Sequence, residues 1–229
     1  MTETETIHAA HLTVGPLRQA LERAAIFAAT DETRPILNGV CMEFEPERDR
    51  VICIGTEGWA MIMAEALGKP GNVHKADQIV IPLDSVRAIL KMLPRKKSDA
   101  DLAVALDIEI RPDADRLTVT MGDQSMAVDL KTGTFPNYRQ LIPTEQGTTN
   151  GTATINPALL AKLAKAAGRD AADKTTIWTA HHSSPIVASG LGFVAVIMPV
   201  FVELGTFAEE VTAFTRTAPP VADPVAVSA

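Results

Sequence analysis

The stretch Gln78-Ile79-Val80-Ile81-Pro82-Leu83 joins a short run of β-branched residues to a proline at the predicted start of an amphipathic helix. Val and Ile favour an extended strand, whereas proline suits the first helical turn, where its missing N–H costs no hydrogen bond. The same order of features recurs at His11–Leu17 and at Thr152–Ala158. The sequence therefore predicts three copies of one strand–helix unit.

The three prolines, Pro16, Pro82 and Pro157, lie 66 and 75 residues apart. This spacing is too long for a solenoid repeat and is typical of a duplicated supersecondary module. After each predicted helix come strand-like blocks separated by turn residues. These blocks are Ile36–Glu45, Val51–Thr56 and Trp59–Ala66, then Leu102–Arg111, Arg116–Met121 and Ser125–Lys131, then Thr175–Ala180, Ile186–Ser189 and Phe193–Pro199. Repeated β-α-β-β-β modules, with helices on one face of antiparallel sheets, predict an α+β fold.

Composition excludes several classes of protein. The 229 residues are 46% hydrophobic and 21% charged, and they contain no run of about 18 apolar residues that would predict a transmembrane helix. The polar, acidic N-terminus is unlike a secretory signal. Cys41 and Cys53 lie in apolar runs and are expected to be buried free thiols of a reducing, cytoplasmic compartment.

The charge is unevenly distributed. A net charge of −7 argues against a protein that coats nucleic acid tightly. Cations nevertheless gather on the predicted helices, on a surface that can follow a phosphate backbone without reading bases. The candidate DNA-binding residues are Arg18, Arg23, Arg87, Lys91, Lys162, Lys165 and Arg169. Lys and Arg are also common on any solvated helix face, and that alternative stays open.

Three further segments stand in a fixed order: Leu37-Asn38-Gly39 leading into Thr56-Glu57-Gly58, then Phe135–Pro143, then Val196-Ile197-Met198-Pro199. On the basis of these three segments and their order, residues 8–202 resemble the bacterial DNA polymerase III beta sliding clamp family. The resemblance implies a processivity factor of DNA replication that has no catalytic activity or cofactor. It also implies two kinds of partner: duplex DNA, held by the helices, and short peptides of DNA polymerase and repair proteins, held in an apolar cleft.

The resemblance also implies a domain organisation. Residues 8–143 correspond to a complete clamp-like domain of two modules, residues 150–202 to half a domain, and residues 203–229 to a C-terminal extension. A ring of the family contains twelve modules, so three modules per chain would require a homo-tetramer. We therefore expect self-association, without membrane contact.

The peptide cleft is transferred residue by residue from the resemblance. The matching positions are Leu37, Thr56, Gly58, Trp59, Met61, Pro136, Leu141, Asn156, Leu159, Ser184, Val196, Ile197, Met198, Pro199 and Val200. Aliphatic and Met side chains make an adaptable apolar surface for the Leu and Phe anchors of a peptide. The chain departs from the family at Ala60 and Gln140, where basic residues are usual, and at Trp59. For each apolar position, ordinary core packing is the alternative.

Other chemistry has weaker support. His181 and His182 are adjacent on a predicted strand and point to opposite faces, so they do not chelate one metal ion. Gly55–Gly58 lacks the lysine and the spacing of a phosphate-binding loop. No metal or catalytic site is therefore predicted. Two other hypotheses stay open: an interaction module that binds clamp-binding peptides without forming a ring, and an enzyme on an unrelated α+β fold.

Overall fold

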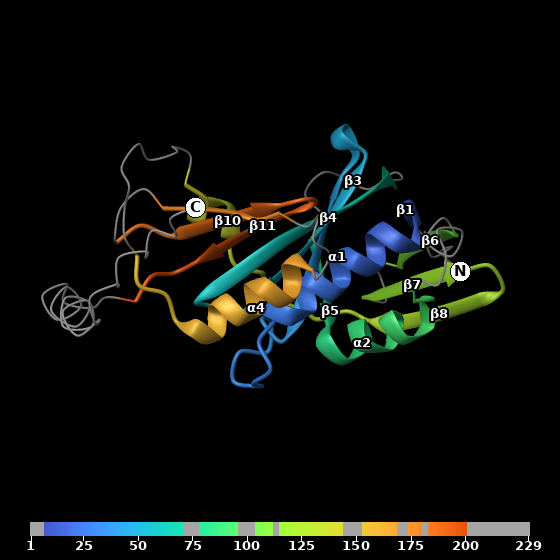
Figure 1. Cartoon of the computed structure of the whole chain (residues 1–229). Coiled ribbons are helices and arrows are strands. Elements are labelled where there is room, and N and C mark those ends of the chain that lie inside the picture. Colours follow the sequence, from blue (N-terminus) through green and yellow to red (C-terminus); the bar gives the residue numbers. More distant parts are fainter. Residues whose placement is uncertain are drawn as a thin grey trace, which may run out of the picture.

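The computed structural model describes residues 7–70, 78–95, 104–111, 115–143, 153–168, 174–179 and 183–200. The α-helices and strands are β1 (Ile7–Thr13), α1 (Val14–Phe27), β2 (Gly39–Glu45), β3 (Arg50–Thr56), β4 (Ala60–Pro70), β5 (Gln78–Pro82), α2 (Leu83–Met92), β6 (Ala105–Arg111), β7 (Arg116–Met121), β8 (Gln124–Asp129), α4 (Pro157–Ala167), β9 (Thr176–Trp178), β10 (Ile186–Gly190) and β11 (Phe193–Ile197). Short 3-10 turns cover Pro46–Arg48 and Tyr138–Leu141. The helices form one layer in front of the strands (Figure 1), and none in the described ranges is long and apolar enough to span a membrane.

The first two modules exchange their first strands. β1, which opens the first module, pairs with β6 of the second, and β5, which opens the second, pairs with β2 of the first. Each exchanged strand also touches the end of its own module, because β1 pairs with β4 and the Lys131 N–H donates to the Val80 carbonyl at 2.8 Å. Neither module can therefore complete its sheet without the other.

The third module continues the sheet of the first. β11 pairs antiparallel with β4, from Phe193 opposite Ala64 to Ile197 opposite Ala60, and β10 and β9 follow in order. The predicted module differs in one detail, because residues 153–156 precede α4 without forming a strand. The equivalent strands β1 and β5 each pair with another module's second strand, and the described chain offers residues 153–156 no such partner.

The sheet is buried on both faces where β2, β3 and β4 lie. Its inner face packs under the helices, with residues such as Met42 and Cys53 in the same core as Leu17. Its outer face carries a second apolar cluster, which includes Cys41 and is covered by Phe135. Cys41 and Cys53 are buried and free, as predicted, and they belong to opposite faces.

Gly55 of β3 permits the close approach of α1. A Cβ placed on Gly55 would lie 1.9 Å from the Ala24 carbonyl oxygen, far inside van der Waals contact. Only glycine therefore fits at this crossing of helix and strand.

Gly55→Ala should lower the free energy of unfolding by about 2–3 kcal/mol, because the helix must move away from the sheet. The matched control is Gly122→Ala, where φ is +57° and no atom lies within 4 Å of the added Cβ. The control should cost about 1 kcal/mol, from backbone strain alone. Urea unfolding followed by circular dichroism measures both variants, and equal costs would contradict this packing.

Candidate functional site

The β3–β4 turn has a fixed shape and presents an exposed aromatic side chain. The Thr56 hydroxyl donates to the Ala60 carbonyl at 2.9 Å and accepts from the Gly58 N–H at 3.1 Å. Gly58 has φ +103°, which favours glycine. Trp59 follows with 68% of its surface exposed, and its carbonyl accepts from the Met198 N–H at 2.9 Å. Thr56 and Gly58 therefore shape the turn, while Trp59 is available for contact.

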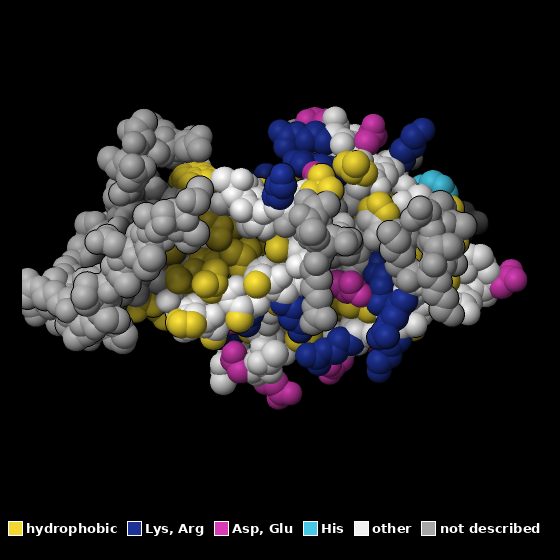
Figure 2. Space-filling model, in the orientation of Figure 1, with side chains coloured by type: hydrophobic (Ala, Val, Ile, Leu, Met, Phe, Trp, Pro, Cys, Tyr) yellow, Lys and Arg dark blue, Asp and Glu magenta, His cyan; other side chains and the backbone are white. Residues whose placement is uncertain are grey.

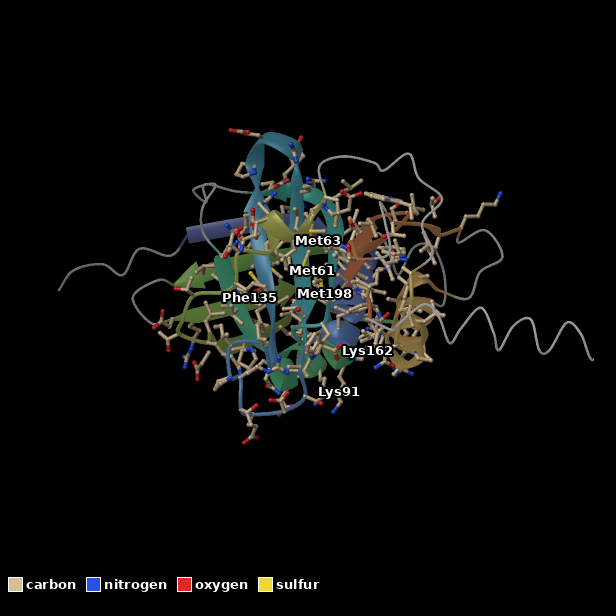
Figure 3. The ribbon with its side chains drawn as sticks, turned by 90° about the vertical axis from the view of Figure 1, so that its left-hand side faces the viewer. Met61, Met63, Lys91, Phe135, Lys162 and Met198 are labelled. Carbon is tan, nitrogen blue, oxygen red and sulfur yellow. The ribbon has the colours of Figure 1, made fainter. Side chains whose placement is uncertain are left out.

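Part of the predicted cleft lies together on the outer face of the sheet. Leu37, Met61 and Val196 belong to one apolar cluster, in which Met61 and Val196 are cross-strand partners on β4 and β11. Met198 is half-buried at the end of β11. Figure 3 shows Met61, Phe135 and Met198 near one another at the centre of the molecule.

The remaining predicted cleft residues are distributed more widely. Leu159 and Ile197 belong to the core under the helices, the alternative that the sequence left open. The Asn156 side chain accepts from the Ala158 N–H at 2.9 Å and so caps α4. The others range from buried to exposed: Pro199 is buried, Ser184 is half-buried, and Pro136, Leu141 and Val200 are exposed.

The outer face also carries a groove that the sequence analysis missed. The groove has a volume of about 380 Å³, and its apolar lining is Ile52, Met63, Tyr138, Ile142, Phe193 and Val194. Most of these residues pack on the cluster of Met61 and Val196, so the groove extends the same surface. Strand alternation places Ile52 and Met63 on this face, but alternation alone does not show which face remains open.

Buried carboxylates fasten the Tyr138–Leu141 turn beside this groove. The Tyr138 hydroxyl donates to Glu43 at 2.6 Å, and Arg139 donates to Glu43 and, at 2.9 Å, to Glu45. Burial alone would raise the pKa of Glu43, but hydrogen bonds from Tyr138, Arg139 and Gln78 outweigh it and hold that pKa below its ordinary value. Burial, together with the Glu43 carboxylate, raises the pKa of Tyr138.

The helix layer concentrates positive charge in an acidic chain. The three helices α1, α2 and α4 carry six cationic side chains and two carboxylates, whereas the whole chain has a net charge of −7. Lys91 and Lys165 are exposed, and Arg87 is exposed beside Asp84 at 2.8 Å. Figure 2 shows Lys and Arg side chains gathered over α2 and the adjoining helix surface.

Two of the predicted DNA-binding residues are instead used inside the fold. Arg23 is only 5% exposed and donates to the carbonyls of Ala166 and Leu191 at 3.0 and 2.8 Å. The expectation of an exposed Arg23 is therefore wrong, because α4 and the β10–β11 turn cover this side of α1. Arg18 donates to the carbonyls of Leu90 and Leu93 at the end of α2.

Lys162 and Arg169 are the remaining predicted DNA-binding residues. Lys162 forms an ion pair with Glu57, so its charge is already partly neutralised. Arg169 lies outside the described residues, as do His181 and His182.

The fold and its two faces define a class of protein: a strand-exchanged, two-module domain of the sliding-clamp type, extended by a third module. The family described as "DNA polymerase III beta subunit, central domain" matches residues 11–137. The chain belongs to this family, as the sequence predicted.

Two curated relatives and a solved structure place the match in context. The chain is 27% identical over 124 residues to the beta sliding clamp of Synechococcus elongatus and 24% identical over 127 residues to the beta sliding clamp homolog GriR of Streptomyces muensis. These alignments cover 54% and 56% of this chain, but 31% and 32% of the relatives, so the chain matches about a third of their length. The DNA polymerase III subunit beta of Pseudomonas aeruginosa has a TM-score of 0.71 at 13% identity, over 88% of this chain and 69% of that one. The predicted fold class is confirmed.

Tyr138 is the sole tyrosine, so its ionisation can be followed alone. In the folded protein, the midpoint of tyrosinate formation, followed by absorbance, should lie above the ordinary pKa of 10.0, because burial and the Glu43 carboxylate disfavour the ionised form. Because the folded pKa is raised, this contact contributes stability below pH 10 that is lost as the pH rises further. Glu43→Gln should lower the pH midpoint of Tyr138 ionisation, whereas the control Glu109→Gln, at an exposed position, should leave it unchanged. A midpoint near 10.0 in the unaltered protein would contradict the buried hydrogen bond between Tyr138 and Glu43.

Proposed function

We propose that the protein is a non-catalytic, clamp-type processivity factor of DNA replication. It contacts or encircles duplex DNA through its helix layer and recruits a DNA polymerase or a repair protein through its outer face. The observation that carries the proposal is the group of exposed cations on the helix layer, Arg87, Lys91 and Lys165, in a chain that belongs to the beta-subunit family. We place this activity in the cytoplasm.

The DNA contact is sequence-independent. Arg87, Lys91 and Lys165 lie on α2 and α4 and are exposed to solvent, so they can neutralise phosphates without reaching base edges. A ring of twelve modules would take four chains, and its helices would line the hole. Sliding along the duplex then follows from backbone contacts that carry no sequence information.

The second partner is a short peptide with aliphatic and aromatic anchors. Trp59, Met198 and Leu141 offer accessible apolar surface, and a backbone hydrogen bond joins Trp59 and Met198 at the end of the β4–β11 pairing that holds the buried Met61–Val196 pair. Such a partner tethers the polymerase and raises its effective concentration at the primer end.

A second candidate function is a peptide-binding module that forms no ring on DNA. Arg18, Arg23 and Lys162 make contacts within the chain, and this engagement favours the second candidate by reducing the cations that can meet phosphate. The two candidates predict different behaviour with circular DNA. Retention on circular but not on linear duplex supports the ring, whereas no retention on either supports the module.

Reversing charge on the helix layer should weaken DNA binding. The triple variant Arg87→Glu, Lys91→Glu and Lys165→Glu should bind duplex DNA at least about tenfold more weakly, with a log–log salt slope shallower by about three. The matched control reverses three exposed cations on strands and a turn: Arg48→Glu, Lys69→Glu and Arg116→Glu. Fluorescence anisotropy across a salt series measures both. Equal losses in the two variants would mean that net charge, and not this surface, governs binding.

Changing the outer face should weaken peptide binding and leave DNA binding intact. Trp59→Ala and Met198→Asp should each weaken the binding of a clamp-binding peptide by about tenfold or more, because each removes apolar contact area. The control Leu67→Ala removes another exposed apolar side chain, 62% exposed on β4. Isothermal titration calorimetry with the peptide is the measurement, and wild-type affinity in both Trp59→Ala and Met198→Asp rules out this surface.

A further inference from the structure

The third helix leaves exposed an apolar position that the first two helices bury. Counting from the residue that precedes each helix (Thr13, Pro82 and Asn156), the fourth position is Leu17 in α1, Val86 in α2 and Leu160 in α4. Leu17 and Val86 are fully buried, whereas Leu160 is 42% exposed. Ala164, four residues further along α4, is also exposed, although its equivalents Leu21 and Leu90 are buried and half-buried.

The second strand of the third module, β9, also exposes an apolar residue at a position that the equivalent strand buries. Ile177 of β9 is the cross-strand partner of Ala188, so its side chain is on the inner face with the helices. The equivalent strand β2 buries its inner residues completely, but Ile177 is 51% exposed. In Figure 2, hydrophobic side chains gather in a hollow over α4 and the strands beside it, at the left of the molecule.

The backbone of this module is also incomplete at two edges. β2 pairs with β3 and β5, whereas β9 pairs with β10 alone in the described part of the chain. Residues 153–156 touch the end of their own module, where the Val200 N–H donates to the Thr154 carbonyl at 2.8 Å, as Lys131 does to Val80. Among the described residues their other edge has no strand, although β1 and β5 use that edge to pair with the second strand of another module.

We propose that two copies of the chain pair through their third modules by exchanging first strands. Residues 153–156 of one copy add to the open edge of β9 in the other, and the reciprocal pairing follows from two-fold symmetry. The exchange covers Leu160, Ala164 and Ile177 with the same surface of the second copy. It builds a complete two-module domain from two halves and gives a dimer with six modules.

The partner that covers this surface is a second copy of the chain, because the third module itself contains both the segment that adds to a sheet and the strand edge that receives such a segment. Within the described part of the chain, residues 153–156 have one edge without a strand partner and β9 has one edge without a strand partner, and each matches the missing partner of the other. Residues 8–143 show the pairing that such modules adopt when two are present. The pairing rule even supplies a register: the residue before the helix faces the first residue of the second strand, as Pro82 faces Gly39 and Thr13 faces Ala105. Asn156 then faces Thr176 of the other copy.

Mass measurement by light scattering, without DNA, tests the inference separately from the proposed function. The full chain should be a dimer, or a larger assembly built from dimers, at about 10 µM, a concentration at which an interface with a dissociation constant of about 1 µM is mostly formed. Leu160→Glu and Ile177→Glu should each shift the dissociation constant upward by at least about a hundredfold, because they place a charge in the paired core. Both side chains are exposed in the single chain, so circular dichroism should stay unchanged. The control Leu67→Glu should assemble like the unaltered chain.

Cysteine cross-linking tests the register. A chain with Asn156→Cys mixed with a chain with Thr176→Cys should form a covalent dimer under mild oxidation, whereas neither chain alone should do so. The native Cys41 and Cys53 are buried and leave the background low. Cross-linking of Thr176→Cys alone would indicate β9–β9 pairing and overturn the exchange. A monomeric chain, including one that dimerises only after deletion of residues 201–229, would overturn it as well.

Discussion

The exchange of first strands between modules is the constraint on which the rest of the structure depends. β1 and β5 each complete the sheet of the other module, so the helices α1 and α2 are brought onto one face by the backbone pairing itself. Antiparallel pairing between distant segments orders a long intervening chain, and that entropy is offset only by a shared core. The two modules are therefore expected to form and to be lost together.

β4 extends this constraint to the third module. Its first half pairs with β11 and its second half with β1, so one strand joins both parts of the chain. The helix layer and the outer face consequently keep a fixed relation to each other. Cations on α2 and α4 face one side of the sheet, while the Met61–Val196 cluster and the adjoining groove face the other. The proposed contacts with DNA and with a peptide therefore lie on opposite sides of the sheet.

Local signals in the sequence predicted the modules well, and contacts between modules account for what it did not predict. Proline after a β-branched run marks a strand–helix junction wherever it occurs, so the first two units could be identified. Arg23 could not be placed, because helical periodicity does not reveal that α1 has a helix on each side. Ile197 was expected in the peptide cleft but lies in the core under the helices. Strand alternation assigns a residue to one face of the sheet but does not show which face holds a cleft. The role of Glu43 in holding Tyr138 joins residues 95 positions apart and leaves no local pattern.

The strand exchange can be measured directly by native-state hydrogen exchange. The account predicts that amides in β1, β2, β5 and β6 share one free energy of opening, equal to that of global unfolding, because no module keeps its sheet when the other opens. If amides within residues 7–70 exchanged by a separate opening from those within residues 78–143, the modules would be independent folding units. That result would contradict the account.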